Sequence, residues 1–408
     1  MPDRAPIVYS MSRTRPWYDR YEPLREEVDL LRKTFHERCK QLNQKPQVIL
    51  DAFSRDIISR AVFESNWQEG IELDRGRTKE LADIVFEDFD QLDIPHIDFA
   101  GILNHHRTQV IALRRKRVSE NELAAYNLSV AHRCLWWITN ELLQRQVAFL
   151  AVALKGFEDR FPQIKNSMPD EARRGIERGF DIISAKLEDP TAPGAPFAGT
   201  FKTTGDLFRK YLECDFETLL NSFRIAHIHF LHRILLMGIL PAQKCGQFRK
   251  KGVHVSNPDL FFPPPQAVPS MMAEFCNDFP ALPPVTGRDH ILMAATFSFR
   301  FVRIHPYADG NGRVSRLLMN LILLSQDLPV YLKADKKGRH RYSQALRRAD
   351  RGNLRPLASL IALSLKEIYG KVLASLERVV HSVNVNPSER TTSDASSSSA
   401  SEIASKQQ

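Results

Sequence analysis

The segment from His305 to Arg316, which reads HPYADGNGRVSR, concentrates residues that could do chemistry. It lies between two strongly apolar helical patterns, Ile291–Ile304 before it and Leu317–Leu324 after it. Pro306 cannot continue the first helix, and the Gly-Asn-Gly turn leads directly into the second. Several free backbone N–H groups therefore meet the positive end of a helix in one small loop. Such a loop is an anion cradle, and the usual anion is phosphate.

The side chains of this loop also suit phosphate chemistry. Arg313 and Arg316 share the first turn of the second helix, so both guanidinium groups can reach the same polyphosphate. Asp309 supplies a hard oxygen ligand for a Mg²⁺ ion that keeps most of its water and bridges phosphates. His305 ends the preceding helix, where it could accept a proton from an attacking hydroxyl group.

Simpler interpretations of the loop explain less of it. Asp-Gly-Asn-Gly is common as a tight turn. A calcium loop that began at Asp309 would place Arg313 and Asn320 at ligand positions five and twelve, which fails its ligand pattern. The sequence contains no GxGxxG, GxxxxGK(S/T) or HExxH motif. The combination of a histidine, an aspartate, Gly-Asn-Gly and two arginines in one loop favours a phosphate site.

The loop closely resembles the signature of Fic (Fido) domain proteins, HxFx(D/E)GNGRxxR, and departs from it only at Tyr307. That position is expected to be an apolar anchor, where a tyrosine hydroxyl needs only a partner or solvent. The resemblance extends upstream to GQFRKKGVHV, FFPPPQAVPSMMAEF and HILMAATFSFRFVRIHPY, and downstream to RYSQALRRADRGNLRPLASLI. These stretches follow the family order from residue 246 to residue 361.

The resemblance implies an all-α fold, a Fic-type helical bundle with a small β-hairpin flap and an N-terminal helical region. It also implies transfer of AMP from ATP to a Ser, Thr or Tyr hydroxyl of a target protein. His305 would be the general base, Asp309 would hold Mg²⁺ on the α- and β-phosphates, and Arg313 would neutralise the departing pyrophosphate. The implied phosphate cradle is formed by the backbone of Gly310, Asn311 and Gly312 with the Asn311 side chain, and Arg316 completes the nucleotide-binding set.

A hairpin is expected at about Val253 to Phe262, because this stretch alternates loosely around an Asn-Pro-Asp turn. By the resemblance it would be a flap that holds the target protein by adding its backbone as an extra strand. The expected target-binding flap residues are Val253, His254 and Val255.

A second motif, FESNWQEGI, lies far upstream and resembles the family's inhibitory pattern (S/T)xxxE(G/N). Ser65, Glu69 and Gly70 stand in its required places. A glycine after a glutamate is also a routine end to a helix. In members with this motif the glutamate pairs with the second arginine of the loop, here Arg316. An anion there would compete with the γ-phosphate of ATP and repel it.

The amino-acid composition excludes several classes of protein. The 408 residues are 43 % hydrophobic and 26 % charged, with a net charge of +9, which excludes disordered, collagen-like and multi-span membrane proteins. Five widely spaced cysteines without a CxxC pair, and an N-terminus without the apolar stretch of a signal peptide, favour a cytoplasmic location. His227, His229 and His232 interrupt the apolar run Ile225–Leu240, which is expected to be a buried helix with structural histidines.

The chain is expected to divide by pattern and composition as follows: a flexible N-terminus over 1–20, an N-terminal helical region over 21–98 with the inhibitory helix at about 52–70, a helical region over 99–215, the Fic (Fido) catalytic domain over 216–383, and a disordered Ser-rich tail over 384–408. A further helix is expected at Arg341–Asp350. The region over 99–215 would recognise targets or form a homodimer.

The favoured interpretation is an autoinhibited protein adenylyltransferase with ATP and target proteins as partners, Mg²⁺ as cofactor and no membrane. Within enzymes, removal of AMP and transfer of another phosphate-containing group stay open. A non-catalytic Fic-fold binding or scaffold protein is the alternative of a different class, and the intact His305, Asp309 and Arg313 argue against it. No helix-turn-helix pattern follows residue 370, so nucleic acid is not an expected partner.

Overall fold

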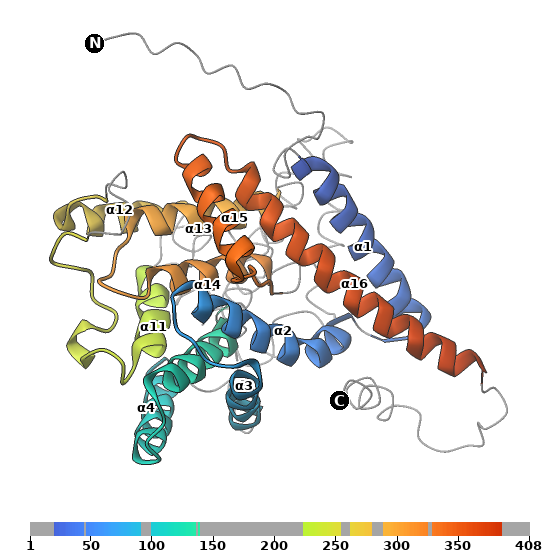
Figure 1. The fold of residues 1–408 in the computed structure, drawn as a ribbon, viewed down its shortest axis with the longest axis horizontal. Helices are drawn as coiled ribbons and strands as arrows, with labels where there is room; N and C mark the ends of the chain where they lie inside the picture. The colour runs from blue at the N-terminus through green and yellow to red at the C-terminus, as the bar shows by residue number, and fades with distance from the viewer. Residues whose placement is uncertain are drawn as a thin grey trace, which may run out of the picture.

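The structure is a computed structural model that describes residues 20–44, 46–90, 99–135, 138, 223–253, 262–279, 289–324 and 329–385. Within these ranges the chain is helical, and its only β-type pairing is an isolated bridge between Met237 and Leu240. The all-α prediction is therefore confirmed. The named helices, drawn in Figure 1, are α1 (Tyr21–Gln41), α2 (Pro46–Gln68), α3 (Arg75–Asp90), α4 (Phe99–Arg115), α11 (Ile225–Leu236), α12 (Val268–Asn277), α13 (His290–Ile304), α14 (Asn311–Leu323), α15 (Lys336–Ala349) and α16 (Arg355–Val385).

Part of the sequence-based prediction lies outside the described residues. The core of the expected hairpin, residues 254–261, is one such part, and the described residues on either side of it form no strand. The expected tail beyond 385 and most of the expected N-terminus over 1–20 lie outside as well. Of the expected helical region over 99–215, residues 99–135 are described; they comprise α4 and a helical stretch over 120–135.

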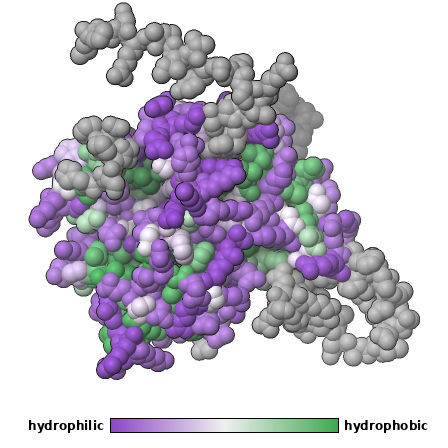
Figure 2. All heavy atoms as spheres, viewed as in Figure 1, coloured by the Kyte–Doolittle hydropathy of each residue, from purple (hydrophilic) through white to green (hydrophobic). Residues whose placement is uncertain are grey.

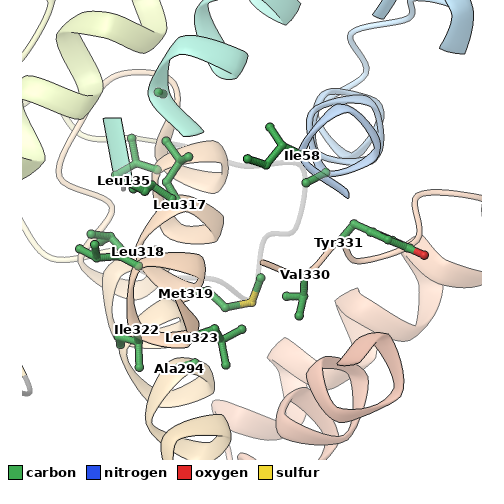
Figure 3. Close-up of a cluster of buried hydrophobic side chains, with 14 of the residues drawn as sticks. Ile58, Leu135, Ala294, Leu317, Leu318, Met319, Ile322, Leu323, Val330 and Tyr331 are labelled. Carbon is green, nitrogen blue, oxygen red and sulfur yellow. The ribbon is translucent and has the colours of Figure 1, made fainter. Parts of the chain in front are cut away.

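Helix α14 forms the centre of the molecule, because nearly every one of its residues is buried. It packs closely against α13, the helix that precedes it across the loop. Apolar side chains from distant parts of the sequence gather around it, including Ile58 of α2 and Leu135 (Figure 3). The loop that could do chemistry thus joins two helices held on several sides by apolar packing, which fixes its position.

The N-terminal helices pack onto the same core. Helix α1 lies along the long C-terminal helix α16, and α2 contacts α14 (Figure 1). The rings of Phe35 on α1 and Tyr369 on α16 are 5.9 Å apart between centroids. The N-terminal helical region and the expected catalytic domain therefore share one hydrophobic core.

Two helices begin earlier than the sequence pattern predicts, for local reasons. Helix α2 begins at Pro46, and proline is well suited to a first helical position because its missing N–H would have no partner there. Helix α15 begins at Lys336 because the Asp335 side chain caps it, with the Gly338 N–H donating at 2.6 Å. The polar run after Asp335 lacks an apolar period, so periodicity alone places the start of α15 too late.

The described surface seen in Figure 2 is mainly hydrophilic, with smaller hydrophobic areas among the polar side chains. Among the described residues, no helix combines the length and the apolar character that crossing a bilayer requires.

Replacement of Phe35 by alanine should lower the free energy of unfolding by about 3 to 5 kcal/mol, because it removes a fully buried ring between α1 and α16. Urea denaturation followed by circular dichroism measures the change. Leu30→Ala on the same helix is the control, since Leu30 is 64 % exposed and its loss should cost about 0.5 kcal/mol or less. Equal losses in the two variants would contradict the packing of α1 on α16.

Candidate functional site

His305 ends α13 with its backbone in the left-handed region, at φ 50° and ψ 57°. This conformation costs a non-glycine residue about 1 kcal/mol or more, so surrounding contacts must hold it. Its Nδ1 donates to the carbonyl of Val302 at 3.2 Å, which leaves the lone pair on Nε2. The imidazole thus presents a proton acceptor from a fixed ring.

The pKa of His305 is lowered from its ordinary value. Burial of the imidazole is the main cause, because it penalises the charged form. The positive charges of Arg249 and Arg303 act in the same direction, whereas the Val302 carbonyl and the Glu69 carboxylate oppose it. The ring is therefore neutral, and able to accept a proton, at physiological pH.

The loop after His305 is closed by Asn311, the first residue of α14. Its Oδ1 accepts from the Tyr307 N–H at 2.9 Å, and its Nδ2 donates to the Tyr307 carbonyl at 2.8 Å. Gly310 makes the turn between them possible with a φ of 78°. The Asn311 side chain thus shapes the loop from within, whereas the family resemblance implies that it lies at the phosphates.

Tyr307, where the family pattern has phenylalanine, is fully buried and its hydroxyl lies 2.8 Å from His229 Nδ1. His232 stacks on the Tyr307 ring at 3.7 Å between centroids. The Nδ1 of His232 accepts from the Gly246 N–H, and its Nε2 donates to the Asp309 carbonyl at 3.1 Å. Burial lowers the pKa of His232 to about 4, so this neutral tautomer holds the backbone of Asp309 in place.

The side chain of Arg313 is 3 % exposed, and two of its nitrogens, Nε and Nη1, have no hydrogen-bond partner. Its Nη2 lies 3.6 Å from Asp309 Oδ1, which also accepts from the Gly310 N–H at 2.6 Å. The Asp309 side chain is half exposed, in contrast. A buried cation with unused donors beside a helix N-terminus is an anion site.

Arg316 contacts two residues of the upstream motif. Its Nε donates to Ser65 Oγ at 2.8 Å, and its Nη2 donates to the Ser65 carbonyl at 2.9 Å and to Glu69 Oε1 at 2.6 Å. Burial opposes ionisation of Glu69, but Arg316, with Arg313 and His305 farther away, outweighs it and lowers the pKa of Glu69. The carboxylate is therefore charged where the structure places it.

The Glu69 carboxylate also lies directly over the first turn of α14. A Cβ atom placed on Gly312 would collide with Glu69 Oε1, so only glycine permits this approach. The carboxylate thus occupies the anion position that the start of α14 offers. Gly70, at φ 75°, ends the turn that carries Glu69 there.

Two further residues of α2 anchor it, and sequence reasoning did not single them out. Glu64 Oε2 accepts from the Ala334 N–H at 2.7 Å, and Gln68 Nε2 donates to the Lys333 carbonyl at 3.0 Å. They lie one helical turn apart, as do Ser65 and Glu69, so one edge of α2 is fixed against α14 and the segment after it. Polar residues at this spacing usually mark a solvated face, so no local signal identifies them.

The expected flap residues are only partly placed. Val253 is described and half-buried, whereas His254 and Val255 lie outside the described residues. Within the described ranges, no group of three His, Cys, Asp or Glu side chains could enclose a metal ion. Asp309 is therefore not part of such a group.

The sequence profile of the Fic/DOC family matches residues 222–323. A curated relative from Nematostella vectensis, named protein adenylyltransferase Fic, is 32 % identical over 166 residues, which is 41 % of this chain and 38 % of that protein. The protein of the same name from Drosophila melanogaster is 32 % identical over 163 residues, covering 38 % of this chain and 31 % of its own length. This chain thus spans well under half the length of these relatives.

Solved structures also align with the chain. One is a Fic domain containing signaling protein from Bacteroides thetaiotaomicron, with a TM-score of 0.45, 15 % identity and coverage of 85 % of this chain and 98 % of that one. Fic-1 from C. elegans aligns with a TM-score of 0.31 and 18 % identity, over 74 % and 89 % of the two chains.

The His305 imidazole should titrate below pH 6.5, the ordinary value for histidine, because burial and nearby arginines disfavour its charged form. Two-dimensional NMR of the histidine rings across a pH series measures the midpoint. The signal is assigned by its loss in His305→Asn, and the exposed His340 serves as an internal reference for the spectra. A midpoint at or above 6.5 would contradict the buried, arginine-flanked setting of the ring.

Proposed function

We propose that this chain, whose residues 222–323 form a Fic/DOC domain, is a protein adenylyltransferase that moves AMP from ATP to a hydroxyl group of a target protein. The names of the curated relatives support this activity. The observation that carries the proposal is the buried Arg313 on the first turn of α14, which has two unpartnered nitrogens, together with His305 on the same loop, whose Nδ1 donates to a carbonyl and leaves the lone pair on Nε2. That arrangement binds a phosphate chain and removes a proton at the same place.

In the proposed reaction, the backbone N–H groups of Asn311 and Gly312 and the guanidinium of Arg313 bind the phosphates of ATP. The Gly310 N–H, which donates to Asp309 Oδ1 in this structure, joins them when it exchanges that carboxylate for a phosphate oxygen. His305 Nε2 takes the proton of the target hydroxyl as its oxygen attacks the α-phosphorus. The bond from the α-phosphorus to the bridging oxygen breaks, and pyrophosphate leaves with the electron pair. Arg313 stabilises the negative charge that develops on the leaving group.

The residues present fit Mg²⁺ as the cofactor. Asp309 is half exposed at the mouth of the cradle and donates a hard carboxylate oxygen, and a lone carboxylate suits an ion that takes its other ligands from phosphates and water. Bound there, Mg²⁺ would supply charge neutralisation on the phosphates. His232 contributes by holding the Asp309 backbone, so the carboxylate is presented from a fixed position.

We propose that α2 autoinhibits the enzyme through Glu69. Its carboxylate contacts Arg316 at 2.6 Å and covers the first turn of α14, where the terminal phosphate of ATP would lie. A negative charge at that position competes with the phosphate for the same cation and repels it. Ser65 supports the arrangement because it accepts two hydrogen bonds from Arg316.

We further propose a cytoplasmic enzyme that acts on other proteins, with the flap around Val253, His254 and Val255 binding the target. The four described cysteines are free and buried, which supports a reducing compartment. Removal of AMP by the same site is the second candidate, because the Glu69 carboxylate lies close enough to the cradle to orient a water molecule.

Glu69→Gly should raise transfer of labelled AMP from ATP to lysate proteins by about tenfold or more, because it frees Arg316 and the start of α14. Glu69→Gln, which keeps the shape but removes the charge, should give an intermediate rate. Scintillation counting of protein-bound label in the presence of Mg²⁺ measures both.

Glu72→Gly is the matched control, since Glu72 is exposed and three residues farther along the chain. Adding His305→Ala to Glu69→Gly should abolish transfer. Equal rates of AMP transfer for Glu69→Gly and the original chain would contradict the proposed autoinhibition. Label transfer that survives His305→Ala would contradict the proposed role of His305 as the base. Loss of AMP removal in Glu69→Gly, alongside a gain in transfer, would support the second candidate.

Ser65→Ala should raise AMP transfer several-fold, to a rate between those of the original chain and Glu69→Gly. It removes the acceptor for Arg316 Nε, a hydrogen bond to a charged group that contributes about 1.5 to 3 kcal/mol, but keeps the carboxylate in reach. The same label assay measures it. Ser59→Ala, another buried serine of α2, should leave the rate unchanged.

A further inference from the structure

Arg249 lies 5 % exposed in the short segment after α11, and its guanidinium donates to three backbone carbonyls. The Nε donates to the His305 carbonyl at 2.7 Å, Nη1 to the Lys251 carbonyl at 3.2 Å, and Nη2 to the Pro263 carbonyl at 2.5 Å. Its own backbone N–H donates to the Pro306 carbonyl at 2.9 Å. One residue thus joins three separate places in the chain.

This arrangement is unusual for an arginine. The described residues show no ion pair between Arg249 and a carboxylate, and burial lowers the pKa of its guanidinium. Surface exposure and charge pairing therefore do not explain why the chain keeps a cation there. What the guanidinium offers is a rigid, planar set of donors that can satisfy several carbonyls at once, which a lysine ammonium cannot reproduce with the same geometry.

The three carbonyls that accept from Arg249 belong to His305 and to two residues that flank the expected target-binding segment. His305 is the proposed base, and its left-handed backbone must be held by its surroundings. Lys251 and Pro263 lie just before and just after residues 252–262. The ring of Phe262, next to Pro263, lies 4.4 Å from the His305 imidazole between centroids. The carbonyl that Arg249 holds at Pro263 therefore also fixes a ring against the base.

We infer that Arg249 is a positioning residue that ties the backbone of His305 to the backbones of Lys251 and Pro263, so that the proposed base and these two points of the chain keep one relative placement. This inference rests on the proposed function for the role of His305. Within the described residues, the hydrogen bonds of the Arg249 side chain go to His305, Lys251 and Pro263 and not to Arg313 or the first turn of α14. Arg249 should therefore act on proton removal and acceptor placement without acting on nucleotide binding.

The test compares Arg249→Lys with the unchanged residue, both in the Glu69→Gly background and in the full chain. Hydrogen–deuterium exchange read by mass spectrometry should accelerate by about tenfold in peptides covering 249–253 and 302–311, and remain unchanged over α16. Label transfer from ATP should fall by about tenfold or more, whereas the Kd for ATP should change by about twofold or less. Arg339→Lys, the same change at an exposed position of α15, should alter none of these quantities.

The outcomes separate this inference from the proposed function. Faster exchange confined to the two peptides, with lower transfer and retained ATP binding, supports it. Unchanged hydrogen–deuterium exchange overturns the inference, because Arg249 would then not hold the backbone of His305. A loss of ATP binding that parallels the loss of AMP transfer also overturns it, because Arg249 would then stabilise the fold in general. If Glu69→Gly itself transfers no AMP, the proposed function fails, and the exchange measurement still decides whether Arg249 holds His305.

Discussion

The site depends on one electrostatic constraint: two arginines are buried at the positive end of a buried helix. Arg313 and Arg316 both lie on the first turns of α14 and are almost inaccessible to solvent. A buried cation is costly unless it is paired, and the helix dipole adds to the positive potential at the same point. The surroundings must therefore supply negative charge. Glu69 supplies it to Arg316, while Nε and Nη1 of Arg313 have no hydrogen-bond partner.

The rest of the fold keeps this constraint in place. The N-terminal helices are part of the same core as α14, so the carboxylate that meets Arg316 is delivered by a helix with its own anchors at Ala334 and Lys333. On the opposite side, His232 and Asn311 fix the loop through backbone atoms, and Arg249 fixes His305 in the same way. These contacts hold the loop through its backbone and do not involve Nε and Nη1 of Arg313.

The sequence predicts those features of the fold and the site that depend on residues close together in the chain, and it does not predict contacts between residues far apart. The helical class and the phosphate-binding character of the loop are local patterns of period, turn and spacing, and they follow directly from the residues. The pairing of Glu69 with Arg316 follows only from the family resemblance, because a glycine after a glutamate is also a routine end to a helix. The contacts of Arg249, Glu64 and His232 join positions far apart in the chain, and each of these residues alone has an ordinary solvated or structural explanation. The Asn311 side chain was assigned to the phosphates by resemblance, although its own spacing to Tyr307 allows the loop-closing bonds that the structure shows.

Because α2 belongs to the same polypeptide as the anion cradle, the ratio of Glu69 to cradle does not depend on protein concentration. A separate inhibitor would dissociate as the protein becomes dilute, and its effect would vary with the relative amounts of the two molecules. The Glu69 carboxylate is present once for every cradle and is held near it at a fixed effective concentration. The proposed restraint of the site would therefore be a property of each single molecule, unaffected by dilution or expression level, and a change in the local equilibrium of α2 would alter it.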